Sequence, residues 1–207
     1  MQTARGALRV GVLYDLLGRR ERRDLRDATV ERLQDRFGVD RAQARRVGSI
    51  AQQALAQLNE EADPDLAQQL GWAAALHEVG FAISHNDYHK HGAYLAQHAD
   101  LAGFSTSDQQ RIALLILGQR GNLKKLAGAL DAPDVLAKSV SLRLAVLLCH
   151  ARRDVELPAW SLRSTRGVIE LGLDGDWLSH HPLTEHLLQE EAAQWEKAGH
   201  RFTLVSL

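Results

Sequence analysis

Apolar residues recur at helical spacing over most of the chain, and this periodicity limits the possible folds more than any other feature. The longest stripe follows Asp40, which can cap a helix that runs to about Glu61. Its apolar members are Ala44, Val47, Ile50, Ala51, Ala54, Leu55 and Leu58. Comparable stripes predict helices over residues 4–17, 24–37, 64–76, 89–101, 108–117 and 134–151. Such stripes are buried against one another, so the sequence predicts a helical bundle.

The pattern changes after Asp154. Residues 160–163 and 168–173 alternate or are β-branched around a Thr-Arg-Gly turn, which predicts a hairpin. Residues 182–198 are helical again, with Leu183 among the residues expected to face inward, and 202–207 form a last strand. We therefore expect a mainly α fold: a helical bundle over 1–155, and a small α+β unit over 156–207 that packs on it.

The composition excludes several classes of partner and location. The chain has 25 basic and 26 acidic residues, a formal charge of −1, so no general attraction to nucleic acid or membrane is expected. Cys149 is the single cysteine, which rules out an internal disulfide and is typical of a reducing cytoplasm. The apolar runs are shorter than the roughly 18 residues of a membrane span. We expect a cytoplasmic protein whose anion sites are local.

Five long segments carry a family resemblance. They are ALRVGVLYDLL (7–17), RRDLRDATVERLQDRFGVD (22–40), ARRV (44–47), LHEVGFAISHNDYHKHGAYL (76–95) and DLAGFSTSDQQRIALLI (100–116). Their order resembles the C-terminal region of the exopolyphosphatase / guanosine pentaphosphate phosphatase (Ppx/GppA) family. The helix–hairpin–helix–strand ending resembles the same family, so the likeness covers essentially the whole chain.

The resemblance implies a C-terminal portion without the catalytic half. In the family, the chemistry lies in two N-terminal actin-like domains with glycine-rich phosphate loops, and Mg²⁺ is the expected metal. Those loops do not occur here, so no catalytic residue is assigned and the chain alone is expected to be inactive. The helical part resembles HD-type metal phosphohydrolases, and is associated with dimerisation and with holding polyphosphate or (p)ppGpp. A homodimer is therefore expected.

A histidine-rich stretch stands where HD enzymes bind metal. His77-Glu78 lies at the His-Asp position, but the early helix has no histidine and Gln119-Arg120 replaces a later one. One hypothesis is a residual divalent ion held by His77, Glu78 and His91, which calorimetry with manganese or zinc would test. The competing interpretation makes His77 a core residue, charged at a helix C-terminus.

The neighbouring histidines admit simpler interpretations. His91, Tyr94 and His98 share a helix face that would line the bundle. His85 and His89 lie in a polar segment and are expected to be solvated.

A basic segment follows the apolar helix 108–117. Arg120, Lys124 and Lys125, with Lys90 and His91 beside them, form a candidate track for polyphosphate, and the resemblance implies the same role. The alternative is a solvated face. A second basic cluster at 19–23 has acidic neighbours and is expected to be solvated. Binding at the track should weaken steeply with salt.

Three functions therefore remain open. The leading one is an accessory domain for polyphosphate or (p)ppGpp recognition and dimerisation. The others are a self-standing HD-type metal phosphohydrolase and a dimerisation module without a ligand. Bound metal would distinguish the metal phosphohydrolase from the other two functions. Polyphosphate binding would distinguish the accessory domain from the dimerisation module.

Overall fold

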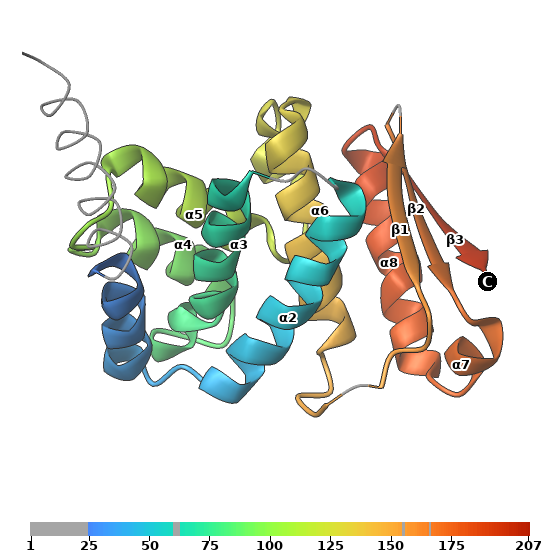
Figure 1. Cartoon of the computed structure of the whole chain (residues 1–207), viewed down its shortest axis with the longest axis horizontal. Coiled ribbons are helices and arrows are strands. Elements are labelled where there is room, and N and C mark those ends of the chain that lie inside the picture. Colours follow the sequence, from blue (N-terminus) through green and yellow to red (C-terminus); the bar gives the residue numbers. More distant parts are fainter. Residues whose placement is uncertain (1–24, 60–62, 155, 166) are drawn as a thin grey trace, which may run out of the picture.

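The protein is a helical bundle with a small sheet at one end (Figure 1). The computed structural model describes residues 25–59, 63–154, 156–165 and 167–207. The predicted helix 4–17 and the basic cluster 19–23 lie outside the described residues. The mainly α fold with an α+β appendix is confirmed.

The helices begin where the sequence supplies caps. A helix over 25–37 ends at Gly38, whose φ of 63° suits glycine. Asp40 caps α2 (Arg41–Leu58) by accepting from the backbone N–H groups of Ala42 and Gln43. Asp63 caps α3 (Pro64–Ala75), and a capping box between Ser105 and Asp108 opens α5 (Thr106–Gly118).

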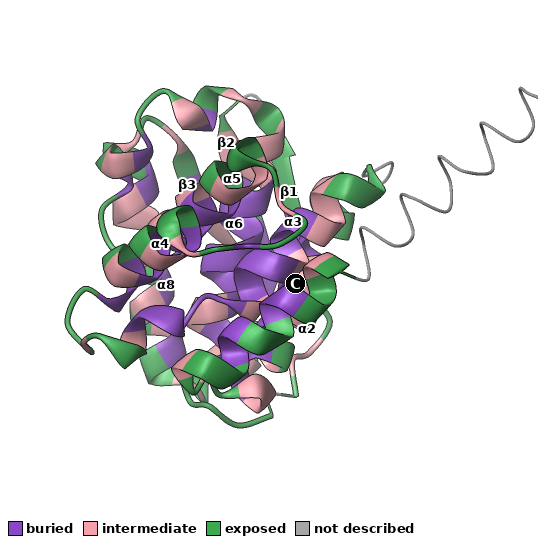
Figure 2. Cartoon of the chain, turned by 90° about the vertical axis from the view of Figure 1, so that its left-hand side faces the viewer, coloured by how far each residue is buried: buried purple, intermediate pink, exposed green. Residues whose placement is uncertain are grey.

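The bundle core lies where α2, α3, α5 and α6 (Pro133–Leu148) meet. The apolar stripe of α2 faces α6 and α3, while α4 (Tyr88–His98) packs on α5. Figure 2 shows buried residues concentrated between the helices and exposed ones on the outer surface. Short 3₁₀ segments, η1 (Val79–Ala82), η2 (Leu123–Leu126) and η3 (Ala129–Asp131), connect the longer helices.

The sheet has the order β1-β2-β3. Strand β1 (Ser161–Thr165) pairs antiparallel with β2 (Val168–Leu173), which confirms the hairpin. Strand β3 (Arg201–Ser206) pairs parallel with β2, because α8 (Pro182–Lys197) returns the chain between them. The backbone N–H of Leu162 donates to Gln57 of α2 at 2.8 Å, and α8 packs on α6.

One apolar core cluster extends from the bundle into the sheet. The division at residues 155 and 156 stays a prediction. One local expectation was wrong. Leu183 is 56% exposed, because the α8 stripe that is buried passes through Leu188 and Trp195 instead. After β2, Asp174 opens a short helix, α7 (Gly175–Ser179), because the Asp174 carboxylate accepts from the Trp177 N–H.

No helix within the described ranges is both long and apolar enough to cross a membrane.

Candidate functional site

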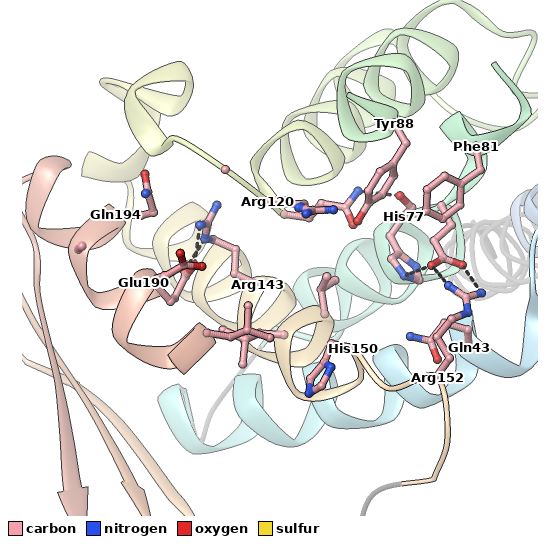
Figure 3. Close-up of a pocket in the computed structure, with 18 of the residues that line it drawn as sticks. Gln43, His77, Phe81, Tyr88, Arg120, Arg143, His150, Arg152, Glu190 and Gln194 are labelled. Atoms are coloured by element: carbon pink, nitrogen blue, oxygen red, sulfur yellow. Dashed lines mark hydrogen bonds and ion pairs between the residues drawn. The ribbon is translucent and has the colours of Figure 1, made fainter. Parts of the chain in front are cut away.

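A cavity of about 630 Å³ lies where the bundle meets α8 (Figure 3). Its walls come from the start of α2, the segment after α3, the end of α5, and the facing sides of α6 and α8. The cavity contains His77, Glu78 and Arg120 of the predicted site residues. Lys90, His91, Lys124 and Lys125 do not line it.

The close approach of two backbone segments positions the aromatic side chains on one wall of the cavity. A Cβ on Gly80 would lie 1.9 Å from the carbonyl oxygen of Tyr88, so only glycine lets η1 rest against the start of α4. This contact brings the rings of Phe81 and Tyr88 to 4.2 Å between centroids. Both rings line the cavity (Figure 3). Burial raises the pKa of the Tyr88 hydroxyl, against the opposing charge of Arg120.

His77 is a buried, neutral residue at the inner end of the cavity. It is 1% exposed, and its Nδ1 donates to the Ala74 carbonyl at 2.7 Å. Burial lowers the pKa of His77 although Glu78 opposes this, so the ring is neutral at pH 7. The expectation of a charged histidine at the helix end is therefore wrong, because burial outweighs the helix dipole.

Arg152 neutralises the carboxylate next to His77. Its guanidinium donates to both oxygens of Glu78, and also to Asp40 Oδ2 at 3.0 Å. Glu78 raises the pKa of Arg152 further, while the Gln43 N–H, and then Arg152, hold the pKa of Asp40 below its ordinary value. These four residues form a closed corner of the cavity, called here the Glu78 corner: Asp40, His77, Glu78 and Arg152.

The Glu78 corner does not fit a divalent metal ion. His77 Nε2 and Glu78 Oε1 are 3.8 Å apart, but both Glu78 oxygens are occupied by Arg152. Among the described residues, no three His, Cys, Asp or Glu side chains are grouped to hold a metal. The ion held by His77, Glu78 and His91 stays a prediction, and a metal there would have to displace a guanidinium.

Arg143 closes the opposite wall. It donates through Nε and Nη2 to the two oxygens of Glu191 on α8, at 2.5 and 2.6 Å. Its Nη1 donates to the Gly118 carbonyl at 2.6 Å. This bidentate pair is almost fully buried, and it ties α6 to α8 at the end of α5.

Arg120 stands exposed at the edge of the cavity, next to the Tyr88 ring at 5.9 Å. No described carboxylate forms an ion pair with it, unlike Arg143 and Arg152. Lys125 Nζ donates to the Arg120 carbonyl, and burial and then Arg143 lower the pKa of Lys125 to about 8. Lys90 lies within electrostatic range of Lys125, and it pairs with Asp87 at 2.9 Å.

These cations are called here the Arg120 rim: Arg120, Lys125 and Lys90, with the exposed Lys124 on η2. The basic segment that follows α5 contains a 3₁₀ helix, in which Leu123 and Leu126 are buried anchors. The structure brings Arg120, Lys125 and Lys90 together. His91 does not line the cavity, and it lies on α4 within electrostatic range of Asp87.

Two histidine expectations were wrong. His89 is buried, at 8% exposure, because it lies on the face of α4 that also buries Gly92, Ala93 and Ala96. Burial, then the charge of Lys125, lowers the pKa of His89 to about 4. Tyr94 is 62% exposed, and its ring lies against the His98 ring at an interplanar angle of 45°, so that face of α4 does not line the bundle.

The sequence did not reveal the cavity's other polar residues. Arg143 had a usable signal, since an arginine inside the apolar run 142–149 must find a buried partner. Gln43 and Arg152 had none, because both act through distant contacts: Gln43 donates to the Cys149 carbonyl, 106 residues away, and Arg152 to Glu78, 74 residues away.

Comparisons with known proteins agree on one family. The family model "Ppx/GppA phosphatase, domain III" matches residues 25–192. A guanosine-5'-triphosphate,3'-diphosphate pyrophosphatase from Pseudoalteromonas translucida (strain TAC 125) is 37% identical over 205 residues, covering 96% of this chain and 41% of that relative. The chain thus spans less than half the length of this relative. It belongs to the Ppx/GppA phosphatase family and corresponds to its domain III.

Proposed function

We propose that this chain is an accessory domain that binds the phosphate groups of polyphosphate or (p)ppGpp for a Ppx/GppA phosphohydrolase. The observation that carries the proposal is the Arg120 rim. Its arginine has no ion-pair partner among the described residues, while two other arginines of the same cavity are neutralised by carboxylates. A guanidinium left without a carboxylate is available for phosphate.

The local charge supports this role although the whole chain is nearly neutral. Lys125 Nζ donates to the Arg120 carbonyl, Lys90 lies within electrostatic range of Lys125, and Lys124 is exposed beside them. Burial, then Arg143 and then Lys90 lower the pKa of Lys125, while Asp87 opposes them, so an added anion would favour the charged form of this lysine.

The name of the relative from Pseudoalteromonas translucida favours a guanosine polyphosphate as one natural ligand. Polyphosphate offers the same repeated oxygen acceptors, so the rim would hold either. A self-standing metal phosphohydrolase gains no support from the Glu78 corner, because Arg152 occupies both oxygens of Glu78.

The test is binding of fluorescently labelled long-chain polyphosphate, with pppGpp as competitor, at 50 and 300 mM salt. We expect binding that weakens steeply with salt, as in complexes that release counterions. The Arg120→Ala variant should bind more weakly, whereas Arg163→Ala, an exposed arginine on β1, should bind as the wild type does. Salt-independent binding, or equal effects of the two variants, would contradict the proposal.

Dimerisation is a second proposed role, favoured by exposed apolar side chains. Ile83, which follows η1, and Tyr94, within α4, are both more than half exposed. Sedimentation equilibrium of the chain should show a dimer, and a Tyr94→Ser variant should weaken it. A monomer at all concentrations would remove this role and leave the phosphate role untouched.

A further inference from the structure

Lys125 differs from other lysines of the chain in what its amine contacts. Its Nζ donates to the backbone carbonyl of Arg120, and among the described residues it forms no ion pair. Lys90 and Lys138 instead donate to carboxylates, at 2.9 and 3.2 Å. A carboxylate partner favours the charged form of a lysine, and a neutral carbonyl does so less. The Lys125 amine can therefore lose its proton without leaving an unpaired carboxylate behind.

The turn before Lys125 holds this amine in place. Gly121 has a φ of 73°, which suits glycine, and the chain reverses there. A Cβ on Gly121 would lie 3.9 Å from Lys125 Nζ, so the side chain folds back over the turn. Asn122 caps η2 by accepting from the N–H of Lys124 at 2.7 Å. The amine is thus positioned against the residue that carries the guanidinium of the rim, Arg120.

The surroundings of Lys125 make it a nucleophile at neutral pH. Burial, then Arg143 and Lys90, lower its pKa to about 8, while Asp87 opposes them. About a tenth of the amine is therefore neutral at pH 7, against less than about a thousandth for a lysine at the ordinary pKa of 10.5. Desolvation and neighbouring cations activate catalytic lysines in the same way. Cys149 offers no such reactivity, because burial raises the pKa of its thiol to about 11.

The guanidinium of Arg120 supplies the second requirement, a place for an anion. It lies at the edge of the cavity beside the Tyr88 ring (Figure 3), without a carboxylate partner among the described residues. A phosphate group bound there would bring whatever it carries close to the turn that positions Lys125.

We propose that Lys125 is a site of acylation by acyl phosphates, in which Arg120 binds the phosphate group and directs the acyl carbon to the amine. An acyl phosphate is a mixed anhydride of a carboxylic acid and phosphoric acid, so one small molecule is both an anion and an electrophile. The inference rests on the proposed phosphate-binding function and adds a regulation of the same site.

The step is an acyl transfer that needs no further reactant. The neutral Nζ of Lys125 attacks the carbonyl carbon of the acyl phosphate, and a C–N bond forms. The bond from that carbon to the phosphate oxygen breaks, and its electron pair leaves with inorganic phosphate, which also takes the proton released by the nitrogen. The product is an uncharged amide.

Acylation would weaken the Arg120 rim, because it removes one of its cations. The affinity for long-chain polyphosphate should fall up to about tenfold, the contribution of one charged hydrogen bond. The rim would thereby respond to the supply of acyl phosphate.

The test is treatment of the 207-residue chain with acetyl phosphate at pH 7, followed by peptide mass spectrometry that locates each acetylated lysine. We expect Lys125 to react about tenfold faster, or more, than its exposed neighbour Lys124 and the exposed Lys197, since more of its amine is neutral. An excess of long-chain polyphosphate should protect Lys125.

A second acyl donor, without phosphate, separates guidance by Arg120 from the intrinsic reactivity of the amine. Arg120→Ala should slow the reaction of Lys125 with acetyl phosphate several-fold. It should leave the reaction with the acetyl ester of N-hydroxysuccinimide unchanged, because the backbone carbonyl that accepts from Lys125 remains. Arg163→Ala, which removes an exposed arginine of β1, is the matched control and should change neither rate.

The effect on binding is measured with Lys125→Arg, which cannot be acylated. Treatment with acetyl phosphate should lower the polyphosphate affinity of the wild type, and should leave that of Lys125→Arg at its own untreated value. An equal loss in both would overturn the inference.

The remaining outcomes distinguish the two proposals. If Lys125 reacts no faster than Lys124, or if Arg120→Ala affects both acyl donors alike, this inference is overturned, while salt-sensitive polyphosphate binding would still support the proposed function. If polyphosphate does not bind at 50 mM salt and acetyl phosphate shows no preference for Lys125, both proposals are overturned. Preferential acetylation that depends on Arg120 and is blocked by polyphosphate supports both.

Discussion

The Glu78 corner and the Arg120 rim border the same cavity, yet they use arginine in opposite ways. In the corner, Arg152 is shared between the carboxylates of Glu78 and Asp40. At the rim, Arg120 has the Tyr88 ring beside it and no carboxylate paired with it among the described residues, while Asp87 pairs with Lys90. Arg143, on the wall toward α8, resembles Arg152, because it is paired with a carboxylate, that of Glu191.

The presence or absence of a carboxylate partner therefore distinguishes the arginines that stabilise the walls of this cavity from the arginine that is available to a ligand. A buried carboxylate that accepts two hydrogen bonds from one guanidinium links the helices or segments that carry the two residues. Removing either partner would leave the other as an unpaired charge in a low-dielectric site. An arginine without a carboxylate partner keeps its donors available to an anion. The position that resembles a metal site thus has its carboxylate occupied by Arg152, and under the proposed function the rim is the part that binds ligands.

The largest loss of stability should follow from breaking the ion pair between Arg143 and Glu191. Arg143→Ala would leave Glu191 as a buried, unpaired carboxylate and the Gly118 carbonyl without its donor. We expect a loss of about 3–5 kcal/mol in the free energy of unfolding, measured by urea denaturation. The control Arg163→Ala should change it by less than about 0.5 kcal/mol. A small loss for Arg143→Ala would show that the wall pair is not structural.

Breaking the Glu78 corner should lower the free energy of unfolding by less than breaking the Arg143–Glu191 pair does. Arg152→Ala leaves Glu78 without partners, but the Arg152 side chain is 44% exposed, so water can partly replace it. We expect a loss of about 1–3 kcal/mol in the same denaturation experiment. Adding Glu78→Gln to Arg152→Ala should recover part of the loss, since it removes the unpaired charge. If the double variant is less stable than the single one, Glu78 has another partner.

A pH change should weaken the rim without weakening the fold. The pKa of Lys125 is about 8, below its ordinary value of 10.5, so this cation is lost as pH rises from 7 to 9. Polyphosphate affinity should fall up to about tenfold, the contribution of one charged hydrogen bond. The unfolded chain holds the Lys125 proton more tightly, so this group's contribution to stability rises with pH in that range.

Polyphosphate titrations at pH 7 and pH 9, with thermal unfolding at both, check the prediction. The Lys125→Ala variant should lose most of the pH dependence of binding. Equal pH dependence in this variant would exclude Lys125 from the site.

The smallest expected effect is that of Arg120→Ala on stability. Because Arg120 is exposed and has no carboxylate partner among the described residues, its removal should change the free energy of unfolding by less than about 0.5 kcal/mol. The same urea denaturation used for Arg143→Ala measures it. A loss as large as that of Arg152→Ala would erase the distinction between rim and corner.

Local rules were enough to predict most of the fold. Asp40 placed the start of α2, and the start predicted at residue 64 agrees with α3, because caps and proline act within one turn. The hairpin followed from alternation around Gly167, whose φ is 80°. The position of Leu183 was missed because two faces of α8 carry apolar residues, and only contact with α6 and the sheet decides which is buried.

The site was only half predictable, since its chemistry depends on long-range contacts. His77, Glu78 and Arg120 were recognised from local patterns and do line one cavity. That Arg152 occupies Glu78, and that Gln119 keeps an unpaired oxygen, depends on elements far apart in the chain. Periodicity and spacing carry no information about such pairs.

The most direct measurement is the salt dependence of polyphosphate binding for the wild type, Arg120→Ala and Arg163→Ala. If the Arg120 rim holds phosphate, the slope of log affinity against log salt should become shallower by about one unit, or slightly less, in Arg120→Ala. It should not change in Arg163→Ala. An unchanged slope in Arg120→Ala, with binding retained, would contradict the assignment and place the phosphate site elsewhere on the chain.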